Sequence, residues 1–148
     1  IGSGASDCSN FADMIRTMYL AAVLPKDYRN DAAISSAEQA IEMATVNGAR
    51  AIGMEKEIGS LEPGKRADVI VINMRNPAWY PNFSEVQNLV YSASGDAVET
   101  VYENGRLIME GRKILTVDEE KTMDRCPELG EAILKRGNLQ VPGKWPIY

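Results

Sequence analysis

One stretch limits most strongly what this chain can fold into: it runs from Ile58 to Asn73 and reads IGSLEPGKRADVIVIN. Its first half contains Pro63-Gly64, which fits the centre of a type II turn because Pro fixes a negative φ and Gly accepts a positive one. Its second half is an unbroken run of β-branched residues, Val69 to Ile72, typical of a strand buried on both faces. We therefore expect a central strand whose side chains are nearly inaccessible, and truncation of Ile70 to alanine is expected nearly to unfold the domain.

Partners for this strand follow later in the chain. Val98 to Glu103 and Arg106 to Glu110 flank Asn104-Gly105, a dipeptide that suits a type I′ turn because both of its central residues need a positive φ. After a second turn at Gly111, the chain continues through Lys113 to Leu115 as a further short strand. The sequence therefore predicts a small β-layer.

Two helical segments are predicted before the β-layer. Apolar residues recur at helical spacing from Phe11 to Leu24, and Pro25 is expected to end that helix. The pattern Ser35-x-x-Glu38 is typical of a capping box and opens the next helix, which Asn47-Gly48 should interrupt.

Smaller features complete the helical prediction. Ala44, Gly48 and Ala49 give the second helix a flat side that should pack very closely against another element. Residues 76–81 cannot be regular, because two prolines bracket this segment and each disfavours helix at the residue before it. A short helix is expected from Val86 to Tyr91.

A further helix is predicted near the C-terminus. Thr116-x-x-Glu119 is a second capping box, Pro127 should break or kink the helix that follows, and Gly137 is placed to cap its far end. In the tail beyond it, Trp145 and Tyr148 are expected to clamp the chain onto a surface, because such aromatic side chains bury a large area.

Composition narrows the classes of function. The chain has 148 residues, 45% of them apolar and 25% charged, which is the balance of a soluble globular domain. A net charge of -5 argues against a nucleic-acid partner, and no long apolar segment predicts a membrane span. Cys8 and Cys126 have no metal-binding spacing and are expected to be free thiols, which predicts a cytoplasmic protein. Because residue 1 is not methionine, we expect a cut inside a longer reading frame.

Asp7 is the candidate catalytic and metal-binding residue. The chain contains no histidine, so a Ser-His-Asp triad and the common histidine metal motifs are excluded within it. Asp7 lies among small residues, from Gly2 to Asn10, that allow a ligand to approach closely, and its carboxylate could bind a metal or accept a proton from metal-bound water. The alternative is that Asp7 or Ser9 simply caps the helix expected to begin near Phe11.

The order of these parts resembles the C-terminal third of the metal-dependent amidohydrolase superfamily, in the branch of cytosine, guanine and methylthioadenosine deaminases and triazine chlorohydrolases. The resemblance covers residues 1 to about 122 and rests on the strings ATVNGARAIGM, IGSLEPGKRADVIVINM and VYENGRLIMEGRKI. Members of this family have a (β/α)8 barrel that holds one Zn²⁺ or Fe²⁺, and a β-sandwich made from both chain ends.

The resemblance implies an α/β fold with three parts. Residues 1–53 would be the last strand-loop and helices of a TIM barrel, residues 54–116 the C-terminal share of a small β-sandwich, and residues 117–148 a C-terminal helix and extended tail. The family pattern resembles G-T-D-G-x-x-S-N, whose Asp binds the metal and shuttles protons. Counted back from Asn10, that Asp falls on Gly4, and only a shifted loop would place Asp7 there.

Two hypotheses of different classes follow. In the first, the chain is the C-terminal fragment of a metal-dependent hydrolase that cleaves a C–N or C–Cl bond of a small nitrogen heterocycle. It would be inactive and metal-free without its N-terminal barrel segment, and the parent would form a homo-oligomer. In the alternative, the chain is a non-catalytic β-rich scaffold or interaction module that has lost the metal site, as Gly4 suggests.

Overall fold

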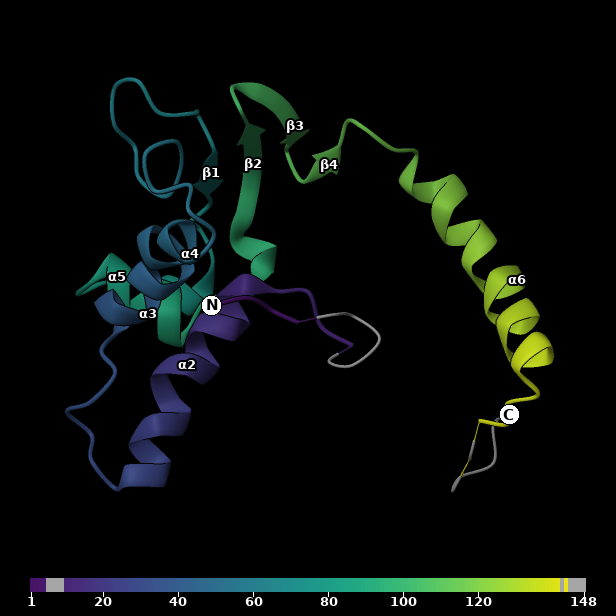
Figure 1. Cartoon of the computed structure of the whole chain (residues 1–148), viewed down its shortest axis with the longest axis horizontal. Coiled ribbons are helices and arrows are strands. Elements are labelled where there is room, and N and C mark those ends of the chain that lie inside the picture. Colours follow the sequence, from purple (N-terminus) through teal and green to yellow (C-terminus); the bar gives the residue numbers. More distant parts are fainter. Residues whose placement is uncertain (5–9, 142, 144–148) are drawn as a thin grey trace. The chain divides into compact units, whose positions relative to one another are not determined.

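The computed structural model describes residues 1–4, 10–141 and 143. The chain divides into two compact units, Ile1–Lys113 and Ile114–Tyr148. The first unit contains a group of helices and most of a small sheet, and the second contains the long helix α6 (Figure 1). Among the described residues, no helix combines the length and apolar character needed to cross a membrane.

Helix α2 spans Met14–Arg29 and begins later than the apolar pattern predicts. Its N-cap is Asp13, whose carboxylate accepts hydrogen bonds from the backbone N–H groups of Ile15 and Arg16. Such a cap satisfies N–H groups that have no partner inside a helix. The prediction of a helix start near Phe11 is therefore wrong, and the residues proposed as its caps, Asp7 and Ser9, lie outside the described part of the chain.

The prediction that Pro25 ends this helix is also wrong, because Pro25 lies inside α2. A proline has no N–H group and so leaves the carbonyl four residues earlier, that of Ala21, without its helical donor. The Ser35 hydroxyl donates to this Ala21 oxygen at 2.8 Å. A side chain from the following loop thus replaces the hydrogen bond that the proline removes.

The next helix also begins one residue away from its predicted cap. Helix α3 spans Ala37–Ala44, and its capping box joins Ser36 and Gln39 instead of Ser35 and Glu38. Both registers fit the motif, but Ser35 has a left-handed backbone with φ 58° and uses its hydroxyl on α2.

The break after α3 falls at Thr45 rather than at Asn47-Gly48. Thr45 has φ -121° and ψ -97°, outside the helical region, and helix α4 then runs from Val46 to Ala51. Asn47 and Gly48 are thus inside a helix, and the prediction that they interrupt one is wrong.

Three helices form the core of the first unit. Helix α5 spans Glu85–Tyr91, close to its predicted range, and packs against α2 and α3. Just before it, the 3₁₀ helix η1 (Pro77–Trp79) gives one regular turn to a segment that was predicted to have none. The buried apolar residues that join the three α-helices are Ile15, Met18, Ala22, Ala37, Ala40 and Val90.

The sheet has the strand order β1-β2-β3-β4, with β1 (Val69–Ile72), β2 (Val98–Glu103), β3 (Arg106–Glu110) and β4 (Lys113–Ile114). The β1–β2 and β2–β3 pairs are antiparallel. The predicted hairpin is confirmed, because Asn104 and Gly105 both have positive φ, 49° and 76°. The turn before β1 is confirmed as well: Gly64 has φ 93°, and the Lys65 N–H donates to the Glu62 carbonyl.

The prediction that β1 is a central, nearly inaccessible strand is wrong. Strand β1 lies at the edge of the sheet, where β2 is its only partner among the described strands. The side chain of Ile70 is 52% exposed and that of Val71 is 46% exposed. A run of β-branched residues favours a strand that is buried on both faces. In this chain, however, the described residues do not provide elements that cover both faces of β1.

The exposure of Ile70 contradicts the expectation that its truncation nearly unfolds the domain, and we expect the larger effect at the buried Val90. Val90→Ala should lower the free energy of unfolding by about 2 kcal/mol, because Val90 is 0% exposed and its loss leaves a cavity. Ile70→Ala should lower it by about 1 kcal/mol or less, because half of the side chain is already in water. Urea denaturation of both variants of the 148-residue chain measures the difference, and a larger loss at Ile70 would contradict the edge position of β1.

Helix α6 spans Glu119–Gly137 and begins at Asp118, whose side chain accepts from the Lys121 N–H. The predicted capping box is wrong, because the Glu119 carboxylate accepts from the Ile114 N–H. Pro127 lies inside the helix and does not end it. Gly137 is the last helical residue, and Asn138 with φ 47° forms the left-handed C-cap that was expected of the glycine.

Candidate functional site

The candidate site is the loop that precedes α2. Asp7 lies outside the described residues, so its role as a metal ligand and proton acceptor stays a prediction. Gly4 is described: its φ is 74°, and a Cβ built on it would meet no atom of the described residues within 4 Å. The position on which the family's aspartate falls has a backbone conformation that Asp and Asn adopt more readily than most residues.

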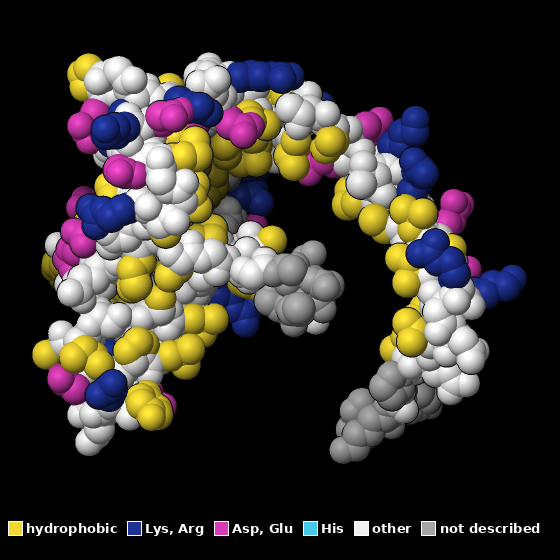
Figure 2. Space-filling view, in the orientation of Figure 1, with side chains coloured by type: hydrophobic (Ala, Val, Ile, Leu, Met, Phe, Trp, Pro, Cys, Tyr) yellow, Lys and Arg dark blue, Asp and Glu magenta, His cyan; other side chains and the backbone are white. Residues whose placement is uncertain are grey.

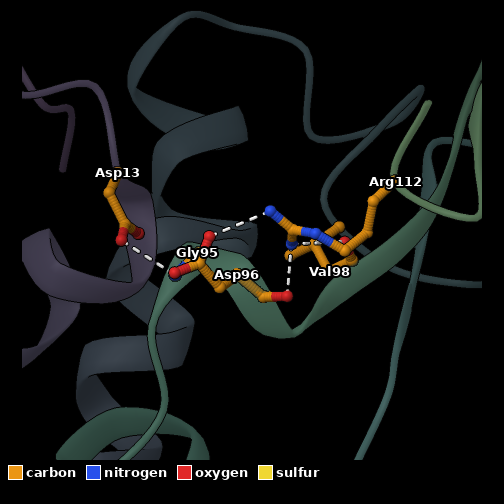
Figure 3. A network of polar contacts seen from close by, with 5 residues as sticks. All are labelled: Asp13, Gly95, Asp96, Val98 and Arg112. Atoms are coloured by element: carbon orange, nitrogen blue, oxygen red, sulfur yellow. Dashed lines mark hydrogen bonds and ion pairs between the residues drawn. The ribbon is translucent and has the colours of Figure 1, made fainter. Parts of the chain in front are cut away.

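The end of this loop is tied to the segment that enters the sheet (Figure 3). One carboxylate oxygen of Asp13 accepts from the Ile15 N–H at 2.8 Å, and the other accepts from the Gly95 N–H at 2.8 Å. Gly95 begins the 3₁₀ helix η2 (Gly95–Ala97), which leads directly into β2. A Cβ at residue 95 would lie 3.0 Å from the Asp13 carboxylate, so a larger residue here would require this carboxylate to shift by a few tenths of an ångström.

A second set of contacts extends from η2 to the turn after β3. The guanidinium of Arg112 forms an ion pair with the Asp96 carboxylate at 2.9 Å and also donates to the Asp96 carbonyl (Figure 3). Both side chains are at least half exposed, so we expect the ion pair to contribute less than about 1 kcal/mol. Asp13, Gly95, Asp96 and Arg112 thus form a positioning network rather than an acid–base pair.

This network was not predicted from the sequence, although one local signal for it is present. Asp13 stands directly before Met14, and an aspartate before the first helical residue is a strong N-cap. The N-cap at Asp13 was missed because the apolar spacing continues back to Phe11 and so predicted an earlier helix start. The bond to Gly95 joins residues 82 positions apart and has no local pattern.

A groove of about 560 Å³ lies between α4, the segment 58–61 and β1. The expected flat side of the helix is confirmed at Ala49, because a Cβ on Gly59 would come within 2.8 Å of the Ala49 Cβ. At the nearby turn, hydrogen bonds from the Ser60 hydroxyl and then from Lys65 hold the pKa of the Glu62 carboxyl below its ordinary value. These contacts order the turn and supply no reactive group.

The described residues do not complete a metal site. The sequence contains no histidine, and among the described residues no group of three or more Cys, Asp or Glu side chains could hold a metal ion. Cys126 is a free, exposed thiol, as expected, and Cys8 lies outside the described part of the chain. At most, Asp7 would contribute one ligand.

Residues 2–108 match the Amidohydrolase family, and the chain belongs to this family. It is 44% identical to a 5-methylthioadenosine/S-adenosylhomocysteine deaminase from Moorella thermoacetica, over 82% of this chain and 28% of the relative. It is 36% identical to an S-triazine hydrolase from Gordonia rubripertincta, over 98% of this chain and 31% of the relative.

Solved structures support the same relationship. An adenosine deaminase from Xanthomonas campestris with bound zinc superposes with a TM-score of 0.85 at 27% identity, covering 88% of this chain and 30% of that one. The zinc complex of the atrazine chlorohydrolase TrzN from Arthrobacter aurescens shares the fold, with a TM-score of 0.76, 20% identity, and coverage of 84% and 28%. The resemblance read from the sequence is confirmed, and the chain spans about 30% of these proteins' length.

Proposed function

We propose that this chain is the C-terminal part of a metal-dependent hydrolase that cleaves a C–N bond, by deamination, or a C–Cl bond of a small nitrogen heterocycle. The observation that carries the proposal is the family match over residues 2–108, together with a fold shared with a zinc-bound adenosine deaminase. In the parent, residues 1–53 would belong to the barrel, 54–116 to a β-sandwich and 117–148 to a C-terminal helix and tail.

In this proposal Asp7 supplies one carboxylate to a zinc or iron site, and the other ligands come from residues outside this sequence. The network of Asp13, Gly95, Asp96 and Arg112 would hold the loop that carries Asp7 at a fixed distance from the sheet. The 148-residue chain by itself should then bind no metal and show no hydrolysis.

The test is to express the longer reading frame that contains this sequence. Release of ammonia from adenosine-type nucleosides and of chloride from chlorotriazines is measured beside the metal content. We expect hydrolysis that a chelator removes and that added Zn²⁺ or Fe²⁺ restores. A longer protein that binds no metal and releases neither product would overturn the proposal.

The role of Asp7 is tested separately in the same longer protein. Asp7→Asn should lower the metal content and the turnover together, because the amide is a weaker ligand and a poor base. Gly4→Asp is the matched comparison, since it places the carboxylate where the family pattern has it. If Asp7→Asn leaves both quantities unchanged, Asp7 is not a ligand and the loop is not shifted.

The second candidate function, a non-catalytic interaction module, is favoured by the exposed edge of the sheet. Ile70 and Val71 present apolar side chains on the edge strand of the described sheet, and an exposed edge strand is a template for pairing with another chain. If this edge binds a partner strand, Val71→Lys should abolish the association in sedimentation experiments. A longer protein that is monomeric and hydrolytic would rule this candidate out.

A further inference from the structure

Within its own unit, helix α6 presents an apolar face that no described residue covers. No residue of the helix is buried. The side chains of Met123, Leu129 and Ile133 are 63%, 52% and 57% exposed. Figure 2 shows hydrophobic side chains gathered along one edge of this helix. Most helical stability in proteins comes from packing of an apolar face, so we expect α6 to be stabilised by packing of this face.

The spacing of the face is that of a helix pair. Met123, Cys126, Gly130 and Ile133 follow one another at intervals of three, four and three residues. This is the a and d pattern of a coiled-coil seam, and two of its members are small enough for a close approach of the backbones. The remaining positions carry most of the charged residues of the helix.

The charges at the two ends of α6 are opposite. The first turn contains Glu119 and Glu120, partly offset by Lys121, and the last turn contains Lys135 and Arg136. These charges complement the dipole of their own helix, but the dipole does not account for the apolar face between them. In a parallel pair of such helices like charges would meet at both ends, whereas in an antiparallel pair each acidic end lies beside a basic end.

We propose that α6 pairs with the α6 of a second copy of this chain in antiparallel orientation. In the register centred on Glu128, Met123 packs against Ile133 of the other copy, and Cys126 packs against Gly130. Each of these two contacts then occurs twice in the dimer, once on either side of the two-fold axis, as the symmetry of a homodimer requires. The inference does not depend on the proposed hydrolase activity, because it uses only the helix.

The test is sedimentation equilibrium of the full 148-residue chain under reducing conditions at low and high salt. We expect a reversible monomer–dimer equilibrium. Ile133→Glu should weaken the dimer about tenfold or more, because it places an unpaired charge in the seam. Ala132→Glu is the matched control: it adds the same charge on the neighbouring residue, which lies on the charged side, and should leave the equilibrium unchanged. Circular dichroism checks that both variants keep the helix.

Orientation is tested by the sign of two charge reversals. In an antiparallel pair, Glu120→Lys and Arg136→Glu should each weaken the dimer by about two- to fivefold at low salt, and less at high salt. In a parallel pair the same reversals would relieve repulsion and strengthen the dimer.

Three outcomes would overturn the proposal. The first is a chain that stays monomeric at high concentration, which would mean that the face is covered within one copy or by another protein. The second is a dimer that Ile133→Glu does not weaken, which would place the contact on another surface such as β1. The third is a dimer that the charge reversals strengthen.

Discussion

Gly59→Ala is expected to lower the free energy of unfolding of the N-terminal unit by about 2–5 kcal/mol, a large part of the stability of an ordinary domain. Gly59 has φ 94°, a left-handed conformation that costs other residues about 1–2 kcal/mol. Its new Cβ would also lie 2.8 Å from the Ala49 Cβ and 3.1 Å from the Val46 Cα, so the segment before β1 would have to move away from α4.

Gly64→Ala distinguishes the cost of the positive φ from the cost of the steric contact with α4. Gly64 has nearly the same φ, 93°, but a Cβ at this position would meet no atom of the described residues within 4 Å. We expect a loss of about 1–2 kcal/mol, from the backbone alone. Urea denaturation followed by circular dichroism measures both variants. Equal losses would show that the close packing of the segment against α4 does not contribute.

Asp13→Ala is expected to lower the free energy of unfolding by about 2–4 kcal/mol. The substitution removes the N-cap of α2, which is worth about 0.5–2 kcal/mol, and leaves the part-buried Gly95 N–H without its acceptor, which costs about 1–3 kcal/mol. The loss should appear as a lower midpoint of urea denaturation with an unchanged slope.

Asp13→Asn is the matched control for this result. Asparagine caps helices about as well as aspartate, but its amide group replaces one of the two accepting oxygens. The variant should therefore keep the cap, lose the bond to Gly95, and fall between the wild type and Asp13→Ala. If Asp13→Asn and Asp13→Ala are equally unstable, the link to Gly95 rather than the cap accounts for the whole effect.

Features with a local physical cause could be predicted from the sequence. The turn at Gly64 and the hairpin at Asn104-Gly105 need positive φ at particular residues, and few sequences supply it. Helix α5 was predicted within one residue of its observed range. The family resemblance, carried by the same strings, was confirmed by the comparisons.

Features that depend on distant partners could not be predicted. The exposure of β1 depends on which elements lie beside it, and the β-branched run carries no such information. The continuation of α2 past Pro25 depends on a hydroxyl ten positions later. The bond from Asp13 to Gly95 likewise depends on the packed fold. The candidate metal ligand Asp7 remains a sequence-based prediction, since it lies outside the described residues.

The contact between Ser35 and the Ala21 carbonyl makes the identities of residues 25 and 35 interdependent during evolution. While proline occupies position 25, loss of the hydroxyl at position 35 leaves the Ala21 carbonyl of α2 without a hydrogen-bond donor. Selection should remove variants with this loss. Once position 25 carries a residue with an N–H group, the helix closes its own hydrogen bond and position 35 is free to vary. Among descendants of this sequence, replacement of Pro25 should therefore precede replacement of Ser35.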